Sequence, residues 1–295
     1  WEPYNRGGMG AVIADLVDPS SGRRLRMERD SCSIDEWLAG SGSAICAVGD
    51  TGFVVFLSPE EIDRLDEYHE QDPYSVQERL ESQFHQRRIR TTLISLESAV
   101  STRGGSARIL DIGCGEGHIT SLIKEAYGTA AIVGLDASLG AISSAKAKYP
   151  EIEFMVADAY QVPFPNDYFD AIVLNNIYEH VPDPMRLLAE VLRLLRSGGE
   201  VVVSTPSRYR TSNLVRVLQG KPVRMMSPQH VTEYTVGQVL EQLKWSGLTD
   251  IQIVPTGESG GGFRAWVGWT LNQALRLRGS HHRVESTVFF LGRKI

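Results

Sequence analysis

The sequence predicts an α/β protein, built on a mostly parallel sheet with helices on both of its faces. Three observations lead to this fold class. Apolar residues make up 42% of the 295 residues, which is enough for a substantial buried core. Seven short apolar runs follow residue 105, and helical patterns alternate with most of them. A glycine-rich turn directly follows the first run. Strand–helix alternation of this kind is typical of βαβ units.

The N-terminal part of the chain has a different pattern. Residues 1–57 contain two β-branched runs and are predicted to form a small β-rich module. Residues 58–104 are predicted to be a helical connector that begins with a capping box, in which Ser58 is the N-cap, Pro59 comes next and Glu61 completes the box. The segment "STRGGSA" then marks the start of the main domain, predicted over 105–295.

The main domain contains the seven predicted strands. They cover 108–113, 130–136, 152–158, 169–176, 199–206, 249–255 and 285–294. Predicted helices lie near 118–127, 138–149, 183–196 and 235–246. The last two strands are expected to form an antiparallel pair at the sheet edge. Ligands of such sheets bind at the carboxyl ends of the strands, and the functional residues are sought there.

Charge and cysteine content exclude some functions. A net charge of −6 and a pI near 5.7 argue against nucleic acid as the main partner, because phosphate backbones require a basic face. Three cysteines at no metal-ligand spacing favour a reducing compartment, and a cytoplasmic protein is expected. No apolar run approaches the ~18 residues of a membrane span, so no stable membrane insertion is expected. A homodimer is left open.

The glycine turn "DIGCGEG" indicates which cofactor is bound. Gly113, Gly115 and Gly117 are spaced G-x-G-x-G, whereas the dinucleotide fingerprint is G-x-G-x-x-G. Asp111 stands two residues before the first glycine. A carboxylate there repels a pyrophosphate and attracts the ammonium and sulfonium groups of S-adenosylmethionine. The turn therefore favours S-adenosylmethionine and disfavours a NAD-dependent dehydrogenase.

Acidic residues at the ends of the next two strands fit the same cofactor. Asp136 ends the second strand, where a carboxylate accepts hydrogen bonds from both ribose hydroxyls, although NAD enzymes share this feature. Asp158 ends the third strand and is placed to accept from the adenine amino group. The alternative for Asp158 is a turn or helix N-cap.

These motifs together resemble a known family. "ILDIGCGEG", "VGLDAS", "VADAYQVPFPNDYFDAIVLNNIYEHVPDP" and "LRSGGEVVVSTP" resemble the successive motifs of class I S-adenosylmethionine-dependent methyltransferases, in the small-molecule subgroup of quinone, sugar and natural-product pathways. The resemblance implies a Rossmann-like seven-stranded sheet with the last strand antiparallel. It also implies a set of cofactor-binding residues: Asp111, Gly113, Gly115, Gly117, Asp136, Ala137, Asp158, Ala159, Asn175 and Asn176.

Candidate catalytic residues follow the fourth strand. His180 is the preferred general base, Glu179 is adjacent to it, and His230 ranks below them. The alternative is that Glu179 and His180 only orient the loop and the following helix. Some quinone-pathway relatives hold a divalent metal here with a Glu-x-x-Glu-His arrangement. Asn176 replaces the first glutamate, and an amide is a poor substitute for a charged oxygen ligand, so no metal is predicted.

A lid insertion is predicted over 206–234. It is too long for an ordinary connection and contains five basic residues before its first acidic residue, Glu233. Arg208 and Arg210 are predicted to meet a phosphate or carboxylate of the substrate, with Tyr234 near the pocket. The alternative is a solvated basic loop. A helical segment at 261–279 is expected to wall the acceptor pocket through Trp266, with a membrane surface as the less favoured alternative.

The sequence thus predicts an enzyme that methylates oxygen or nitrogen of a small molecule, such as a sugar, polyketide-like or quinone-like acceptor. Two rivals are retained. One is an S-adenosylmethionine-binding fold that catalyses another reaction, such as a cyclisation. The other is a catalytically silent binding or partner-activating module.

Overall fold

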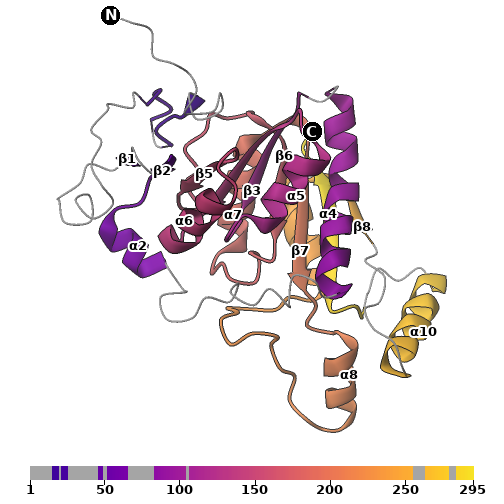
Figure 1. The fold of residues 1–295 in the computed structure, drawn as a ribbon. Helices are drawn as coiled ribbons and strands as arrows, with labels where there is room; N and C mark the ends of the chain where they lie inside the picture. Colours follow the sequence, from indigo (N-terminus) through magenta and orange to yellow (C-terminus); the bar gives the residue numbers. More distant parts are fainter. Residues whose placement is uncertain are drawn as a thin grey trace, which may run out of the picture.

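A computed structural model describes residues 15–19, 21–25, 46–48, 52–65, 83–103, 106–254, 263–278 and 284–295 (Figure 1). Its strands are β1 Cys46–Val48, β2 Phe53–Val55, β3 Arg108–Ile112, β4 Ala131–Asp136, β5 Glu153–Val156, β6 Phe169–Asn175, β7 Leu195–Pro206, β8 Thr249–Val254 and β9 Thr287–Arg293. Its helices are α2 Pro59–Leu65, α4 Gln83–Thr102, α5 His118–Ala126, α6 Leu139–Lys148, α7 Pro184–Leu194, α8 Thr211–Leu218, α9 Val236–Ser246 and α10 Phe263–Leu277.

The strands of the described residues form one sheet in the order β1-β2-β5-β4-β3-β6-β7-β9-β8. The seven predicted strands are β3 to β9, and β9 lies antiparallel between β7 and β8. The predicted fold class is therefore confirmed, including the antiparallel pair at one sheet edge. Because β3 is flanked by β4 on one side and β6 on the other, the strand order reverses there, which is where such sheets bind ligands.

Strand register aligns the ends of the central strands. Ile112 of β3 is paired with Leu135 of β4 and with Leu174 of β6. The residues that follow these three positions therefore lie side by side at the carboxyl ends of β3, β4 and β6. This alignment brings together residues that are far apart in the chain, such as Ile112 and Leu174.

The N-terminal strands belong to the same sheet. β2 is parallel to β5, with Val54 opposite Met155 and Val55 opposite Val156, and β1 pairs antiparallel with β2. The described strands of the module predicted over 1–57 thus extend the main sheet. The connector begins as predicted, because the Ser58 hydroxyl accepts from the Glu61 amide at 3.2 Å and the Glu61 carboxylate accepts from the Ser58 amide at 2.8 Å.

Helices cover both faces of the sheet. α4 and α5 pack on one face, where Leu96 and Ile123 are buried against residues of β3 and β4. α7 and α9 pack on the other face through buried side chains such as Leu187 and Leu243. α8 and α10 project from the same end of the molecule, outside these layers (Figure 1). None of the described helices is long and apolar enough to cross a membrane.

Candidate functional site

The glycine turn after β3 needs glycine for conformational reasons. Gly113, Gly115 and Gly117 have φ values of 73°, 53° and 76°, in the left-handed region that disfavours other residues. A Cβ at Gly113 would lie 2.8 Å from the Ile177 side chain. The Gly113 amide donates to the Leu135 carbonyl at 2.7 Å, which ties the turn to the end of β4. The backbone can therefore approach a ligand closely at this point.

Asp136 connects the turn to the end of β4. One of its carboxylate oxygens accepts from the Gly115 amide at 2.8 Å, and the other accepts from the Ser138 amide at 2.9 Å. These two backbone bonds fix the orientation of the Asp136 carboxylate at the end of β4. Asp136 thus both holds the turn and faces the cavity described next.

A cavity opens at the carboxyl ends of β3, β4, β5 and β6. Six predicted cofactor residues line it: Gly113, Asp136, Ala137, Asp158, Ala159 and Asn176. The predicted catalytic residue His180 lines it as well. Ala157 and Tyr160, which the sequence places beside the adenine ring, line it too, whereas the lining residues Leu65, Leu135, Ser138, Ile177, Val181 and Pro182 were not assigned to the site from the sequence. Leu65 comes from α2, and only the pairing of β2 with β5 brings that helix to this place.

Asp158 and Tyr160 form one wall of the cavity. The Asp158 carboxylate accepts from the Tyr160 amide at 2.8 Å, which shapes the turn after β5. The Tyr160 hydroxyl accepts from the Asp183 amide at 2.9 Å, and the Arg186 guanidinium lies 4.7 Å from the ring centre. The Tyr160 ring is therefore held beside a carboxylate at the position where an adenine was predicted.

Asp111 lies behind the glycine turn and not among the residues lining the cavity. It is only 1% exposed, and one of its oxygens accepts from the Thr120 hydroxyl at 2.7 Å. Its other oxygen, Oδ1, is buried and has no hydrogen-bond partner among the residues that the structure describes. Burial raises the pKa of Asp111 to about 7, against the lowering effect of the Thr120 hydrogen bond. A cationic group near the turn would stabilise the ionised form.

Asn175 and Asn176 follow each other at the end of β6 but face different surroundings. Asn175 is buried, donates to the Thr92 hydroxyl at 3.0 Å and accepts from the Ser204 hydroxyl at 3.0 Å. Asn176 lines the cavity, has a φ of 56°, and donates to the Glu179 carboxylate at 2.9 Å. Asn175 therefore fixes the strand end, while Asn176 is presented to the cavity.

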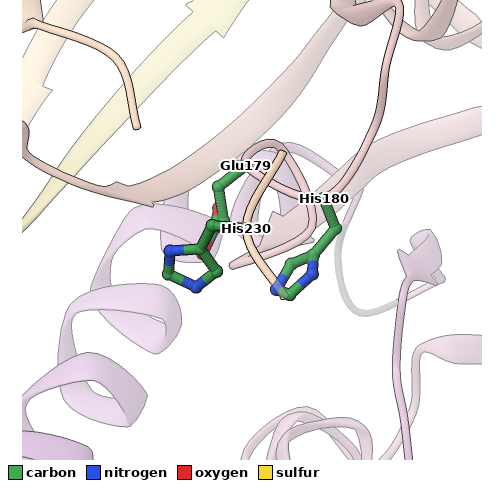
Figure 2. A group of neighbouring side chains, drawn as sticks. All are labelled: Glu179, His180 and His230. Carbon is green, nitrogen blue, oxygen red and sulfur yellow. The ribbon is translucent and has the colours of Figure 1, made fainter. Parts of the chain in front are cut away.

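The three predicted catalytic residues come together (Figure 2). Glu179 and His180 lie on the loop after β6, and His230 lies on the segment after α8. One potential ligand atom from each lies within 4.8 Å of the others, and the two imidazole rings meet edge to face at 4.9 Å. The Val231 amide donates to the Glu179 carbonyl at 2.9 Å, which docks the lid segment onto this loop.

Glu179 is the most deeply buried member of the cluster. It is 1% exposed and accepts from the Asn176 amide and, at 3.0 Å, from the Thr205 hydroxyl. Burial raises the pKa of Glu179, while the neighbouring imidazoles and the Asn176 bond act in the opposite direction. The cluster can therefore bind a cationic or proton-donating group next to the cavity.

The lid segment corrects one substrate prediction. Arg210 was predicted to meet the substrate, but it is 6% exposed and forms a buried ion pair with Glu233. It also donates to the carbonyls of Ser207 and Arg224. Its donors thus hold the lid together. Arg208 is exposed, and its amide donates to the Tyr234 carbonyl at 3.0 Å.

Tyr234 and Trp266 also lie outside the lining of the cavity. The Tyr234 ring packs edge to face against Tyr178 at 5.4 Å. Trp266 lies on α10, which does connect β8 with β9 as expected, but its side chain is 59% exposed. The contact of Trp266 with the acceptor stays a prediction.

Comparison with known proteins gives one family. Residues 110–203 match the family described as "Methyltransferase domain". A probable S-adenosylmethionine-dependent methyltransferase of Mycolicibacterium smegmatis is 29% identical over 140 residues, which cover 48% of this chain and 51% of that protein. The demethylmenaquinone methyltransferase of Renibacterium salmoninarum is 38% identical over 99 residues, which cover 33% of this chain and 40% of that protein.

A solved structure supports the fold. The structure of the [4+2]-cyclase SpnF superposes with a TM-score of 0.51 at 23% identity, over 72% of this chain and 84% of that one. This likeness concerns the architecture alone. The chain spans about half or less of the length of these curated relatives. The residues that match the family, 110–203, contain the glycine turn and the ends of the strands around the cavity.

Proposed function

The chain belongs to the class I S-adenosylmethionine-dependent methyltransferases, and from this premise we propose that it methylates an oxygen or nitrogen atom of a small molecule. The observation that carries the proposal is the composition of the cavity. Asp136 and Asp158 line it in chain order at the ends of consecutive strands, beside a glycine turn that a Cβ would obstruct. A pyrophosphate at this turn would be repelled by the carboxylate of Asp111 behind it, whereas the cationic groups of a sulfonium cofactor would be attracted.

The residues present fit the cofactor's chemical groups. Asp136 lines the cavity, its carboxylate is oriented by the Gly115 and Ser138 amides, and it would accept from the ribose hydroxyls. Asp158 would accept from the adenine amino group beside the Tyr160 ring. The carboxylate of Asp111, whose Oδ1 has no hydrogen-bond partner among the described residues, would attract the positive charge at the methionine end of the cofactor across the glycine turn. Gly113 and Asn176 would border the methionine portion.

When bound, the cofactor supplies a methyl carbon activated by its sulfonium. The chain's own task is to position the acceptor in line with that carbon and to make its nucleophilic atom available. The acceptor's lone pair forms the new bond to carbon, the carbon–sulfur bond breaks with its electrons left on sulfur, and the acceptor loses a proton. Glu179, His180 and His230 stand where the nucleophile would be activated, because His180 lines the cavity.

The acceptor remains defined only by class. We propose a sugar, polyketide-like or quinone-like molecule that enters beneath the lid at 206–234. Arg208 is exposed on this lid and is the arginine we retain for an acceptor phosphate or carboxylate. The domain limits of 57/58 and 104/105 likewise remain proposals.

Asp136→Ala is expected to weaken S-adenosylmethionine binding by about 1.5–3 kcal/mol, the scale of hydrogen bonds to a charged acceptor. Isothermal titration with the cofactor measures the change. Glu151→Ala, at an exposed position before β5, is the matched control and should bind as the wild type does. An affinity unchanged in Asp136→Ala would remove this carboxylate from the cofactor site.

Turnover tests the reaction itself. The enzyme is incubated with S-adenosylmethionine and a panel of hydroxylated and aminated acceptors, and S-adenosylhomocysteine is measured by chromatography. We expect its release only when an acceptor is present, in equal amount with a product heavier by one methylene. An acceptor converted without release of S-adenosylhomocysteine would favour the cyclisation alternative. Cofactor binding without conversion of any acceptor would favour the silent module.

A further inference from the structure

We propose that Glu179, His180 and His230 form a binding site for a divalent transition-metal ion at the rim of the cofactor cavity. The cluster offers two imidazoles and one carboxylate, with one ligand atom from each within 4.8 Å of the others (Figure 2). Ligands bound to one such ion lie about 3–4 Å apart, because each bond is about 2.0–2.2 Å long. Small side-chain rotations would bring the three ligand atoms to these distances.

The charge of Glu179 supports a cation at this point. Its carboxylate is 1% exposed, and the hydrogen bonds described for it come from neutral donors, the Asn176 amide and the Thr205 hydroxyl. A carboxylate buried this deeply is ordinarily paired with a positive charge or coordinated to a metal. A divalent ion would provide that charge while both imidazoles stayed neutral.

His230 is supported by a second carboxylate, that of Glu233. Its Nδ1 lies 3.0 Å from the Glu233 carboxylate, and an ionised carboxylate only accepts, so Nδ1 carries the proton and Nε2 offers its lone pair. The Glu233 carboxylate is also paired with the Arg210 guanidinium and accepts from the Met226 amide, which supports its ionised form. A carboxylate behind a histidine ligand is the usual support of a metal site.

The position of the site gives the ion a role in the proposed methyl transfer. His180 lines the cofactor cavity, so open coordination positions would face the acceptor. Metal-bound oxygen atoms lose their protons more readily, and an oxygen-bearing acceptor is therefore the substrate class that this site favours. This role rests on the proposed function, whereas metal binding itself does not.

The sequence predicted no metal because Asn176 stands where some relatives have a glutamate. In the structure, Asn176 donates to Glu179, and the third ligand comes from the lid, fifty residues further along the chain. A histidine so distant in sequence is not recognisable as a ligand from spacing. The two-histidine, one-carboxylate set also suits zinc, iron, cobalt or nickel better than magnesium.

The test uses Co²⁺ as a spectroscopic probe. The full-length protein is treated with a chelator, dialysed, and titrated with Co²⁺ while visible d–d absorption and heat are recorded. We expect one ion per chain, with absorption lost in both His230→Ala and Glu179→Gln. His85→Ala is the matched control, because His85 stacks on His118 outside the cluster, and it should retain the absorption.

Binding of S-adenosylmethionine is measured on the same samples, so the two proposals can fail separately. Wild-type protein that binds the cofactor but no Co²⁺ would overturn the metal site and leave the methyltransferase proposal standing. Co²⁺ binding that persists in both cluster variants would also overturn it. If the variants do not fold, the wild-type titration alone decides, because the absence of a stoichiometric site contradicts the inference.

Discussion

Glu233→Gln should lower the free energy of unfolding by about 3–5 kcal/mol. Glu233 is 2% exposed and its carboxylate accepts from Arg210, the Met226 amide and His230. Removing one partner of a buried ion pair leaves the other charge uncompensated in a poorly solvated place, which is costly. Glutamine preserves the size of the side chain, so the loss reports charge and not packing.

Urea denaturation followed by circular dichroism measures this loss. Glu241→Gln is the matched control, because Glu241 is exposed on α9, and it should change stability by no more than about 0.5 kcal/mol. A loss below about 1 kcal/mol in Glu233→Gln would mean that the lid is not held by the buried pair.

Asp111 should make the wild type less stable as the pH rises, and Asp111→Asn should remove this dependence. Burial raises the pKa of Asp111 from 3.8 to about 7. Between about pH 4 and pH 7 the folded state therefore keeps a proton on Asp111 that the unfolded state has lost. Because folding then requires the uptake of a proton, the free energy of unfolding falls as the pH rises through this range. At 1.36 kcal/mol for each pKa unit, the contribution reaches about 4 kcal/mol.

The measurement compares urea midpoints of both proteins from pH 5 to pH 8. Asparagine cannot ionise, so the stability of Asp111→Asn relative to wild type should rise across this range and level off above pH 7. The quantity that tests the prediction is the pH dependence of the stability difference between the two proteins. A difference that is constant with pH would instead reflect how the new amide packs. Parallel curves would show that Asp111 titrates near its ordinary pKa.

Much of the fold could be predicted from local sequence. Each strand of the central sheet is an apolar run bounded by polar or glycine residues, and the capping box at Ser58 involves only neighbouring residues. The addition of β1 and β2 next to β5 could not be predicted. Such pairing depends on contacts between residues about a hundred positions apart, and neither short strand carries a signal for its partner.

A site residue could be predicted from the sequence where its type and its place at the end of a parallel strand are enough to identify it. Asp136 and Asp158 reach the cavity because the ends of parallel strands meet at one edge. Arg210 shows where this reasoning fails. A run of basic residues looks like a substrate-binding face, but Glu233 lies within reach only after the lid folds, and burial then favours pairing. His230 is drawn into the cluster by the same folding.

The most direct test of the cofactor assignment is a calorimetric titration of the wild-type protein with S-adenosylmethionine and, separately, with NAD. Asp136 and Asp158 in the cavity predict saturable binding of S-adenosylmethionine, one molecule per chain, and the Asp111 carboxylate behind the glycine turn predicts no measurable binding of NAD. Tight binding of NAD with none of S-adenosylmethionine would contradict the assignment and the function derived from it.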